Sequence, residues 1–270
     1  MHRIWIFLLS AAILAACVGR GSAPASTASA PSLEGEMIVF AAVSLTEPFR
    51  ELAARFEQDH PAVKVIFNFG ASSILRTQIL QGAPADLFAS ADEKNMEEVA
   101  RAGRVAEGPW IFATNRLAIV APASNPGRVT ALADLARPGL RLALPSSEVP
   151  IGAYAREVLA RAARDPAYGS DFAERVLRNV VSSEPNVRAA LARVALGEAD
   201  AAFVYRTDVT PAYRERVRVV EIPDPVNVIA RYPIALLKEA PCPAAARAFL
   251  ELLRSPRGQE VMQRWGFGAP

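Results

Sequence analysis

The 270-residue sequence predicts an α/β protein of two lobes, each a mostly parallel sheet flanked by helices, joined by two crossover strands. Apolar runs rich in β-branched residues alternate with segments of helical period, which is typical of βαβ units. Two long apolar strands, at 117–122 and 229–237, flank a single inserted βα series. About 230 residues follow position 36, which is enough for one large or two ordinary α/β domains.

The first lobe begins with a buried strand at 37–43. Phe49, Leu52, Ala53 and Phe56 then mark one face of a helix, because they are spaced at i, i+3, i+4 and i+7. The strand and helix pattern repeats twice, at 63–69 with 73–81 and at 85–90 with 92–102.

The second lobe continues the same alternation, and the chain then returns to the first. The expected strands are 141–144, 179–182 and 201–205, and the expected helices are 152–164, 172–177 and 187–196. After the strand at 229–237, helices are expected at 244–253 and 258–265. We therefore expect lobe I to comprise 37–118 plus 231–270 and lobe II to comprise 119–230.

The N-terminus has the pattern of an export signal at 1–16. Arg3 precedes an apolar run that is too short to span a membrane, and the run ends at Leu14-Ala15-Ala16-Cys17, which resembles the bacterial lipobox. We expect Cys17 to become the lipidated first residue of the mature protein; the alternative is an ordinary signal peptide that happens to contain a cysteine. The following polar residues predict a flexible tether, giving 17–36 for the lipidated cysteine and tether together.

The charge balance and the cysteine count exclude several classes of protein. Thirty Lys and Arg stand against 28 Asp and Glu, and the basic residues are scattered, so nucleic acid binding is not indicated. Of the two cysteines Cys17 is assigned to lipid, so Cys242 has no partner for a disulfide within the chain. We interpret Cys242, in Pro241-Cys242-Pro243, as a residue at the start of a helix.

Catalytic motifs are missing from the sequence. It contains no G-x-S-x-G elbow, H-E-x-x-H, paired C-x-x-C or P-loop. His60 lies at a predicted helix-to-strand turn and is interpreted as a surface turn residue, because a general base needs a partner in a cleft. The protein is therefore predicted not to be an enzyme, although an envelope enzyme built on the same two lobes is the alternative from a different class.

Four strand-to-helix junctions offer hydrogen-bond donors suited to an anion. Inward-pointing N–H and O–H groups at helix N-termini favour negative charge. The junctions lie at Ser44, at Ser72 with Ser73, at Gly152 and at Asn186. Each also has a structural explanation: a capping box from Ser44 to Glu47, N-caps at Ser72 or Ser73 and at Asn186, and a packing role for Gly152.

Several segments closely resemble the periplasmic molybdate-binding proteins of molybdate ABC transporters. The resemblance spans nearly the whole chain after the tether. It is carried by AAVSLT (41–46), FGASS (69–73), GAPADLFASAD (82–92), VPIGAYA (149–155), NVRAAL (186–191), GEADAAFVYRTD (197–208), YPI (232–234) and WGF (265–267).

The resemblance implies a fold, a site and a partner. The fold is the type 2 periplasmic-binding-protein fold, with the ligand between the lobes. Carried over residue by residue, the ligand shell is formed by hydroxyl and backbone N–H groups of Ser44 and Ser72, backbone N–H groups of Ile151 and Val187, and the phenol of Tyr205. The family often has Ala at the position of Ile151, but the backbone donor is unaffected.

Molybdenum would be bound only as its oxyanion by these five residues, with no cofactor. A monomer anchored in the periplasm or at the cell surface would deliver it to an ABC permease.

A shell of donors alone suits molybdate for a physical reason. Molybdate is a tetrahedral dianion without a proton near neutral pH, so an acceptor in the shell would repel it. Phosphate keeps a proton at that pH and favours a carboxylate acceptor, and none of the five positions is Asp or Glu. Tungstate has nearly the same size and charge and is the candidate next to molybdate. Sulfate or thiosulfate is the alternative ligand, because cavity size rather than charge must separate it from molybdate.

Overall fold

The computed structural model describes residues 33–270. The predicted signal peptide (1–16), Cys17 and the first part of the predicted tether lie outside the described residues. The first strand begins at Gly35, two residues inside the predicted tether. Within 33–270, no helix is both long enough and apolar enough to cross a membrane.

Strands and helices alternate through most of the described chain. The strands are β1 (Gly35–Ala42), β2 (Val63–Gly70), β3 (Leu87–Ala89), β4 (Val105–Pro122), β5 (Leu142–Pro145), β6 (Val180–Glu184), β7 (Ala201–Tyr205), β8 (Val217–Glu221) and β9 (Ile229–Leu237). The α-helices are α1 (Thr46–Asp59), α2 (Ser72–Leu80), α3 (Glu93–Arg101), α4 (Pro150–Ala162), α5 (Phe172–Arg178), α6 (Val187–Ala195), α7 (Pro243–Arg254) and α8 (Pro256–Arg264). Short 3₁₀ helices are η1 (Val43–Leu45), η2 (Leu132–Ala136) and η3 (Arg206–Asp208).

The strands form one mixed sheet in the order β2-β1-β3-β9-β4-β7-β5-β6, and β8 also pairs with β4. The three strands at each end are parallel to one another. The long strands β4 and β9 pair antiparallel in the middle, and each also pairs antiparallel with a neighbour from one end. The two predicted crossover strands are therefore present, and both belong to the hydrogen-bonded sheet.

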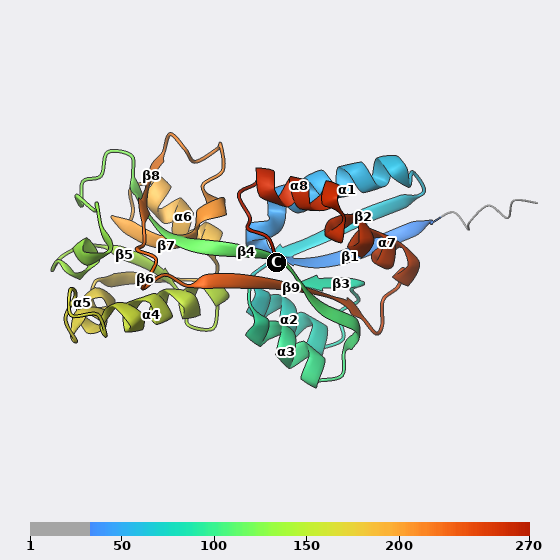
Figure 1. Cartoon of the computed structure of the whole chain (residues 1–270), viewed down its shortest axis with the longest axis horizontal. Helices are drawn as coiled ribbons and strands as arrows, with labels where there is room; N and C mark the ends of the chain where they lie inside the picture. The colour runs from blue at the N-terminus through green and yellow to red at the C-terminus, as the bar shows by residue number, and fades with distance from the viewer. Residues whose placement is uncertain (1–32) are drawn as a thin grey trace, which may run out of the picture. The chain divides into compact units, whose positions relative to one another are not determined.

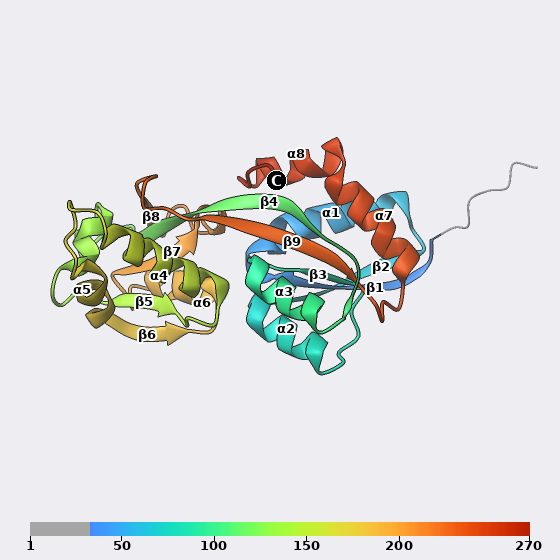
Figure 2. The same ribbon diagram turned by 60° about the horizontal axis from the view of Figure 1, so that its bottom comes forward.

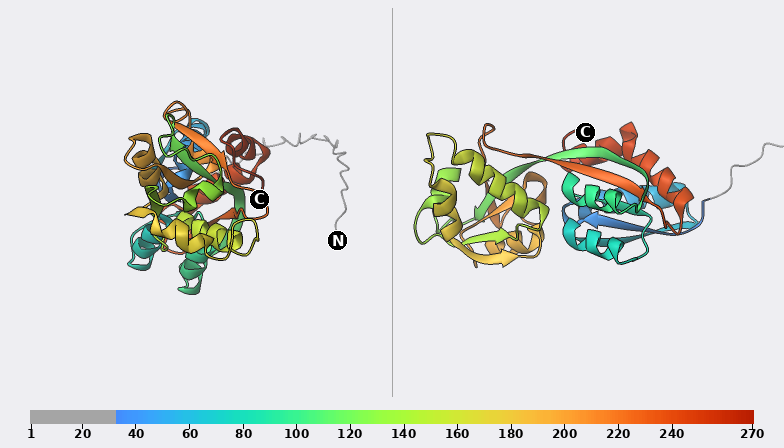
Figure 3. Two further views of the ribbon diagram at one scale, coloured as in Figure 1. Left: turned by 90° about the vertical axis from the view of Figure 1, so that its left-hand side faces the viewer. Right: turned by 90° about the horizontal axis from the view of Figure 1, so that it is seen from below.

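Two groups of helices gather around the two ends of the β4 and β9 pair (Figures 1 and 2). We call the group made by β1 to β3, η1, α1 to α3, α7 and α8 lobe I, and the group made by β5 to β8, η2, η3 and α4 to α6 lobe II. Seen from below, β4 and β9 run side by side from one lobe to the other (Figure 3). The lobe boundaries at 118/119 and 230/231 stay a prediction, because both strands are continuous through the junction.

Helices cover both faces of the lobe I sheet because each has one apolar stripe. In α1, the predicted face of Phe49, Leu52, Ala53 and Phe56 is buried. It packs with α7 and α8 into the main core, which continues into lobe II. A second cluster, formed by side chains of α2 and α3 against the other face, completes the α/β sandwich.

The predicted element boundaries agree with the structure to within about two residues in most cases, and two features differ. The strand expected at 117–122 is only the end of the 18-residue β4. Its first part consists of exposed and half-buried residues and contains register shifts, so it has no apolar run to reveal it. Strand β8 was not expected; it is a short edge strand in which only Val217 and Val220 are buried.

Candidate functional site

All five predicted ligand residues line a single pocket. Ser44 and Ser72 come from lobe I, while Ile151, Val187 and Tyr205 come from lobe II. The remaining lining residues are Ala42, Val43, Gly70, Ala71, Ala91, Val149, Pro150 and Asn186. The cavity volume is about 220 Å³, including the part open to solvent. The lining contains no charged side chain, so any ligand charge must be met by dipoles and hydroxyl groups.

Ser44 is not a helix cap. It lies in η1, and α1 begins after Leu45 without a hydrogen bond from any capping side chain, so the predicted capping box is wrong. The buried Ser44 Oγ instead lies 3.1 Å from the hydroxyl of Tyr232 on β9. Since this hydroxyl is not used to start the helix, it is available to the pocket.

Ser72 is likewise not a cap in the structure. The N-cap position of α2 is Ala71, and no capping side chain bonds the start of the helix, so the N-cap interpretation of Ser72 and Ser73 is wrong. Ser72 Oγ accepts a hydrogen bond of 2.9 Å from the backbone N–H of Ala91. Because a hydroxyl has one proton and this oxygen is already accepting, the proton of Ser72 is free to donate into the pocket.

Ile151 and Val187 stand in the first turns of α4 and α6, where backbone N–H groups have no acceptor within the helix. Within residues 33–270, the N–H groups of Ser72, Ile151 and Val187 donate to no other protein atom. The N-cap role of Asn186 is confirmed, since its side chain accepts from the N–H of Ala189 at 3.0 Å. Three helix N-termini with free donors therefore contribute to one pocket.

Gly152 has the predicted packing role. A Cβ at this position would lie 2.0 Å from the carbonyl oxygen of Ser146 and 2.5 Å from that of Pro145. Only a glycine allows the start of α4 to approach the preceding loop this closely. The position of the Ile151 N–H therefore depends on this residue.

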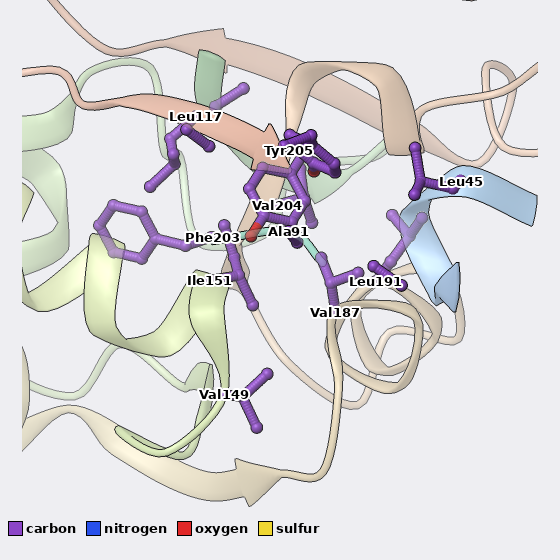
Figure 4. Packing of buried hydrophobic residues seen from close by; sticks show 14 of the residues in the cluster. Leu45, Ala91, Leu117, Val149, Ile151, Val187, Leu191, Phe203, Val204 and Tyr205 are labelled. Carbon is purple, nitrogen blue, oxygen red and sulfur yellow. The ribbon is translucent and has the colours of Figure 1, made fainter. Parts of the chain in front are cut away.

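Tyr205 ends β7 and is almost fully buried, and its hydroxyl has no hydrogen-bond partner within the described chain. Figure 4 shows its ring beside Ile151, Val187 and Ala91, which come from other elements. Burial, with smaller contributions from Tyr232, Tyr154 and nearby carboxylates, raises the pKa of Tyr205 well above its usual value of 10. The phenol thus stays protonated and remains a donor. A buried polar group without a partner is costly, so a ligand that accepts its proton would remove that cost.

An ion pair next to the pocket connects the two lobes. Arg188 on α6 contacts Glu47 on α1 at 2.5 Å and lies 3.4 Å from the buried carboxylate of Asp208. Burial raises the pKa of Asp208 to about 6, although Arg188 and a hydrogen bond from the Tyr205 N–H act in the opposite direction. The ion pair provides an electrostatic link between lobes that does not itself enter the pocket.

His60 and Cys242 both lie at helix ends, as predicted. His60 is the C-cap of α1, and Cys242 is the N-cap of α7 with its Sγ donating to the carbonyl oxygen of Glu34. Neither residue lines the pocket. Within the described residues, no group of three or more His, Cys, Asp or Glu side chains is placed to hold a metal ion.

The residues that support the serines were not predicted from the sequence. The Ala91 N–H and the Tyr232 hydroxyl lie in segments that carried the family resemblance, but neither was given a role. Asn115, a buried polar residue on β4, was also missed. Asn115 stands between Thr114 and Arg116, so no local pattern of the sequence distinguishes it.

Known proteins with similar sequences match nearly the whole described chain. Residues 37–268 match the family model of the bacterial extracellular solute-binding protein. The molybdate-binding protein ModA of Mycobacterium tuberculosis is 38% identical over 265 residues, which is 97% of each chain. The putative ABC transporter substrate-binding lipoprotein YvgL of Bacillus subtilis is 30% identical over 99% of this chain and 98% of its own.

Solved structures agree with this fold. The periplasmic molybdate-binding protein of Azotobacter vinelandii superimposes with a TM-score of 0.74 at 23% identity, covering 87% of this chain and 99% of that one. The sulfate-binding protein SubI of Mycobacterium tuberculosis superimposes with a TM-score of 0.77 at 21% identity, covering 87% of this chain and 86% of that one. The fold is thus shared by binding proteins for different oxyanions and does not by itself select a ligand. The relatives are transport proteins rather than enzymes, and this chain belongs to the family of bacterial extracellular solute-binding proteins.

Proposed function

We propose that this protein captures molybdate, with tungstate as the second candidate, outside the cytoplasm and delivers it to the permease of an ABC importer. The buried Tyr205 hydroxyl, protonated and without a partner at the wall of the pocket, is the observation that carries the proposal. It requires an acceptor that the described residues do not supply. The ModA relatives, which match almost the entire chain, support molybdate as that acceptor.

The chemistry of the pocket suits a dianion that has no proton to donate. Ser44, Ser72 and Tyr205 offer hydroxyl groups, and the first turns of α2, α4 and α6 offer free N–H groups with the positive ends of their helix dipoles. No Asp or Glu lines the pocket, so a protonated oxyanion such as hydrogen phosphate finds no carboxylate to accept its proton. We therefore propose these five residues as the binding shell, with molybdenum present only as its oxyanion.

Capture requires the lobes to close over the ion. Closure would bend the chain where β4 and β9 pass between the lobes, in the manner of hinge closure around ligands. We place the hinge near 118/119 and 230/231. Ser44 and Ser72 already share one pocket with the second-lobe donors, and the Glu47 to Arg188 ion pair is formed, which supports this conformation as the closed state; opening would separate the two walls and break the ion pair. The closed monomer would present one surface to the permease.

We also propose that the protein is held at the membrane by lipid on Cys17. The lipobox-like Leu14-Ala15-Ala16-Cys17 and the name of the YvgL relative support this anchor. In cells that express the Cys17→Ser variant, the protein should be released from the membrane fraction or misprocessed. Intact-mass analysis of the membrane-extracted protein should show a diacylglyceryl addition, and an unmodified Cys17 would exclude the anchor.

A thermal-shift panel on the whole protein in detergent tests the ligand. A ligand at about 100 times its Kd stabilises the folded state by about 2.7 kcal/mol, which corresponds to a shift of about 5 to 10 °C in a protein of this size. Molybdate and tungstate should give such shifts, while phosphate and chromate at equal concentration should give less. A larger shift with sulfate or thiosulfate would assign the pocket to that anion, and no shift with any of these anions would refute the proposal.

A further inference from the structure

The two serines of the pocket each have one buried hydrogen-bond partner on the side away from the pocket. Ser72 Oγ accepts from the Ala91 N–H at 2.9 Å, and Ser44 Oγ lies 3.1 Å from the Tyr232 hydroxyl. A hydroxyl can donate or accept, so an isolated serine adapts to either kind of ligand atom. The atom behind each serine therefore decides what the serine offers to the pocket.

The direction of the hydrogen bond between Tyr232 and Ser44 follows from the environment of Tyr232. Its side chain is fully buried, and in the described chain its hydroxyl has two hydrogen-bond partners, Ser44 Oγ and Asn115 Nδ2. The amide nitrogen, 3.5 Å away, can only donate. Ser44 Oγ is consequently the one acceptor for the Tyr232 proton.

The orientation of the Asn115 amide is fixed by its own contacts. Its Oδ1 accepts from the backbone N–H of Arg116 at 2.9 Å, and its Nδ2 donates to Thr207 Oγ1 at 2.8 Å. A flipped amide would place two donors together at Arg116. The nitrogen thus faces Tyr232, and the chain of donors runs from Asn115 through Tyr232 to Ser44.

We propose that this Asn115–Tyr232–Ser44 relay makes Ser44 a fixed donor and thereby sets the selectivity of the pocket for oxyanions that carry no proton. The inference rests on the proposed function for the location of the ligand. With one lone pair of Ser44 Oγ accepting from Tyr232, the Ser44 proton is directed to the pocket, so a P–OH group that approaches from the pocket meets an O–H rather than a free lone pair. Tyr232 and Asn115 are positioning residues, because they act through Ser44 and do not line the pocket.

The relay predicts a specific effect for Tyr232→Phe. Ser44 regains its rotational freedom and can accept a proton from hydrogen phosphate. Because only the orientation and polarisation of one donor are lost, molybdate affinity should fall by about fivefold. Phosphate affinity should fall less or rise, so the ratio of molybdate to phosphate affinity should drop by at least about threefold.

The test is a calorimetric double-mutant cycle on the whole protein in detergent, with Tyr232→Phe, Ser44→Ala and the double variant. The affinity for inorganic phosphate is measured by competition, in which phosphate at millimolar concentration displaces bound molybdate. Urea unfolding of each ligand-free protein separates loss of fold from loss of binding. Tyr168→Phe is the matched control, because it removes the hydroxyl of a tyrosine whose ring packs on Phe172 and which does not line the pocket; this variant should bind as the unmodified protein does.

The relay requires Tyr232→Phe to have less than about a twofold effect on molybdate affinity once Ser44 is alanine. The same loss in both backgrounds would overturn the relay and leave Tyr232 a residue of the fold. If no variant binds phosphate detectably, the cycle with molybdate alone decides whether Tyr232 acts through Ser44. If the unmodified protein prefers sulfate, the proposed ligand fails, yet the same cycle run with sulfate still tests the relay.

Discussion

The two lobes supply donors to the same pocket in different ways. The lobe I hydroxyls of Ser44 and Ser72 are each tied to a buried partner within the protein. The lobe II phenol of Tyr205 is as deeply buried, yet it has no partner in the described chain. The lobe I wall is therefore oriented before any ligand arrives, whereas the lobe II wall contains a donor that only a ligand can satisfy.

This difference separates effects on stability from effects on binding. Removing a lobe I hydroxyl leaves a buried protein group without its partner, so both the fold and the ligand lose a hydrogen bond. Removing the Tyr205 hydroxyl takes away a group that the ligand-free protein does not satisfy. The predictions below test that contrast in order of their expected effect on affinity.

The largest loss is expected for Gly152→Ala. The new methyl group would meet two backbone carbonyl oxygens, which cannot move as a flexible side chain can, so the start of α4 must shift with its N–H groups. We expect unfolding free energy to fall by about 1 to 3 kcal/mol and molybdate affinity to fall on the order of a hundredfold. Calorimetry and urea unfolding measure the two effects. Ala153→Ser, one residue further along at an exposed position, is the control and should change neither.

Tyr205→Phe should affect binding alone. Loss of a hydrogen bond to a charged acceptor costs about 1.5 to 3 kcal/mol, which is roughly a tenfold to hundredfold loss of affinity. The ligand-free protein should be as stable as the unmodified one or more stable, because an unsatisfied buried hydroxyl is removed. Unchanged molybdate affinity in the folded variant would show that the phenol is not a ligand, and a large loss of apo stability would show that it has a protein partner.

Ser72→Ala should affect both binding and stability. The ligand loses one donor, and the Ala91 N–H loses its acceptor. We expect about a tenfold loss of affinity and a decrease of about 1 to 3 kcal/mol in the unfolding free energy of the ligand-free protein. Ser73→Ala is the matched control, since Ser73 does not line the pocket. Equal apo stability for the two variants would contradict the contrast between the lobes.

Asp208→Asn should have the smallest effect on affinity, because Asp208 lies behind the pocket, but it should change the pH dependence of stability. Burial raises the pKa of Asp208 to about 6, above its usual 3.8. The folded protein therefore binds this proton more readily than the unfolded chain between about pH 4 and 6, and the contribution of Asp208 to stability falls as pH rises through that window. The decrease is at most about 3 kcal/mol, on the order of 1.36 kcal/mol per pKa unit.

Urea unfolding of both proteins between pH 4 and 7 checks this prediction. Relative to the Asp208→Asn variant, the unmodified protein should lose stability from pH 4 to 6, with no further change from this group above pH 7. Stability curves that run parallel across the whole range would mean that Asp208 titrates as it does in the unfolded chain.

The sequence predicted most of the fold because periodicity reports burial. The α1 face and the apolar run of β9 could be identified from local pattern alone. The first part of β4 could not, since its residues are exposed or half-buried and its pairing with β9 depends on a segment more than a hundred residues away. The pairing register between two strands so far apart in the sequence cannot be predicted from the local pattern of either strand.

The candidate site was predicted in its positions but not in its hydrogen bonds. The five residues follow from resemblance, and the structure places them around one pocket. The cap interpretations of Ser44 and Ser72 were wrong, because the partners that compete for these hydroxyls, Tyr232 and the Ala91 N–H, come from other strands or loops. Which atom a buried hydroxyl bonds is a tertiary property.

The most direct test of the account is to locate the bound metal. In crystals of the protein grown with molybdate, an anomalous difference map at the molybdenum absorption edge should show one peak enclosed by Ser44, Ser72, Ile151, Val187 and Tyr205. Oxyanion oxygens should lie within about 3.2 Å of Tyr205 Oη and of both serine Oγ atoms, the usual limit for such hydrogen bonds. A peak outside this pocket, or an Asp or Glu carboxylate in contact with the anion, would contradict a pocket made of donors alone.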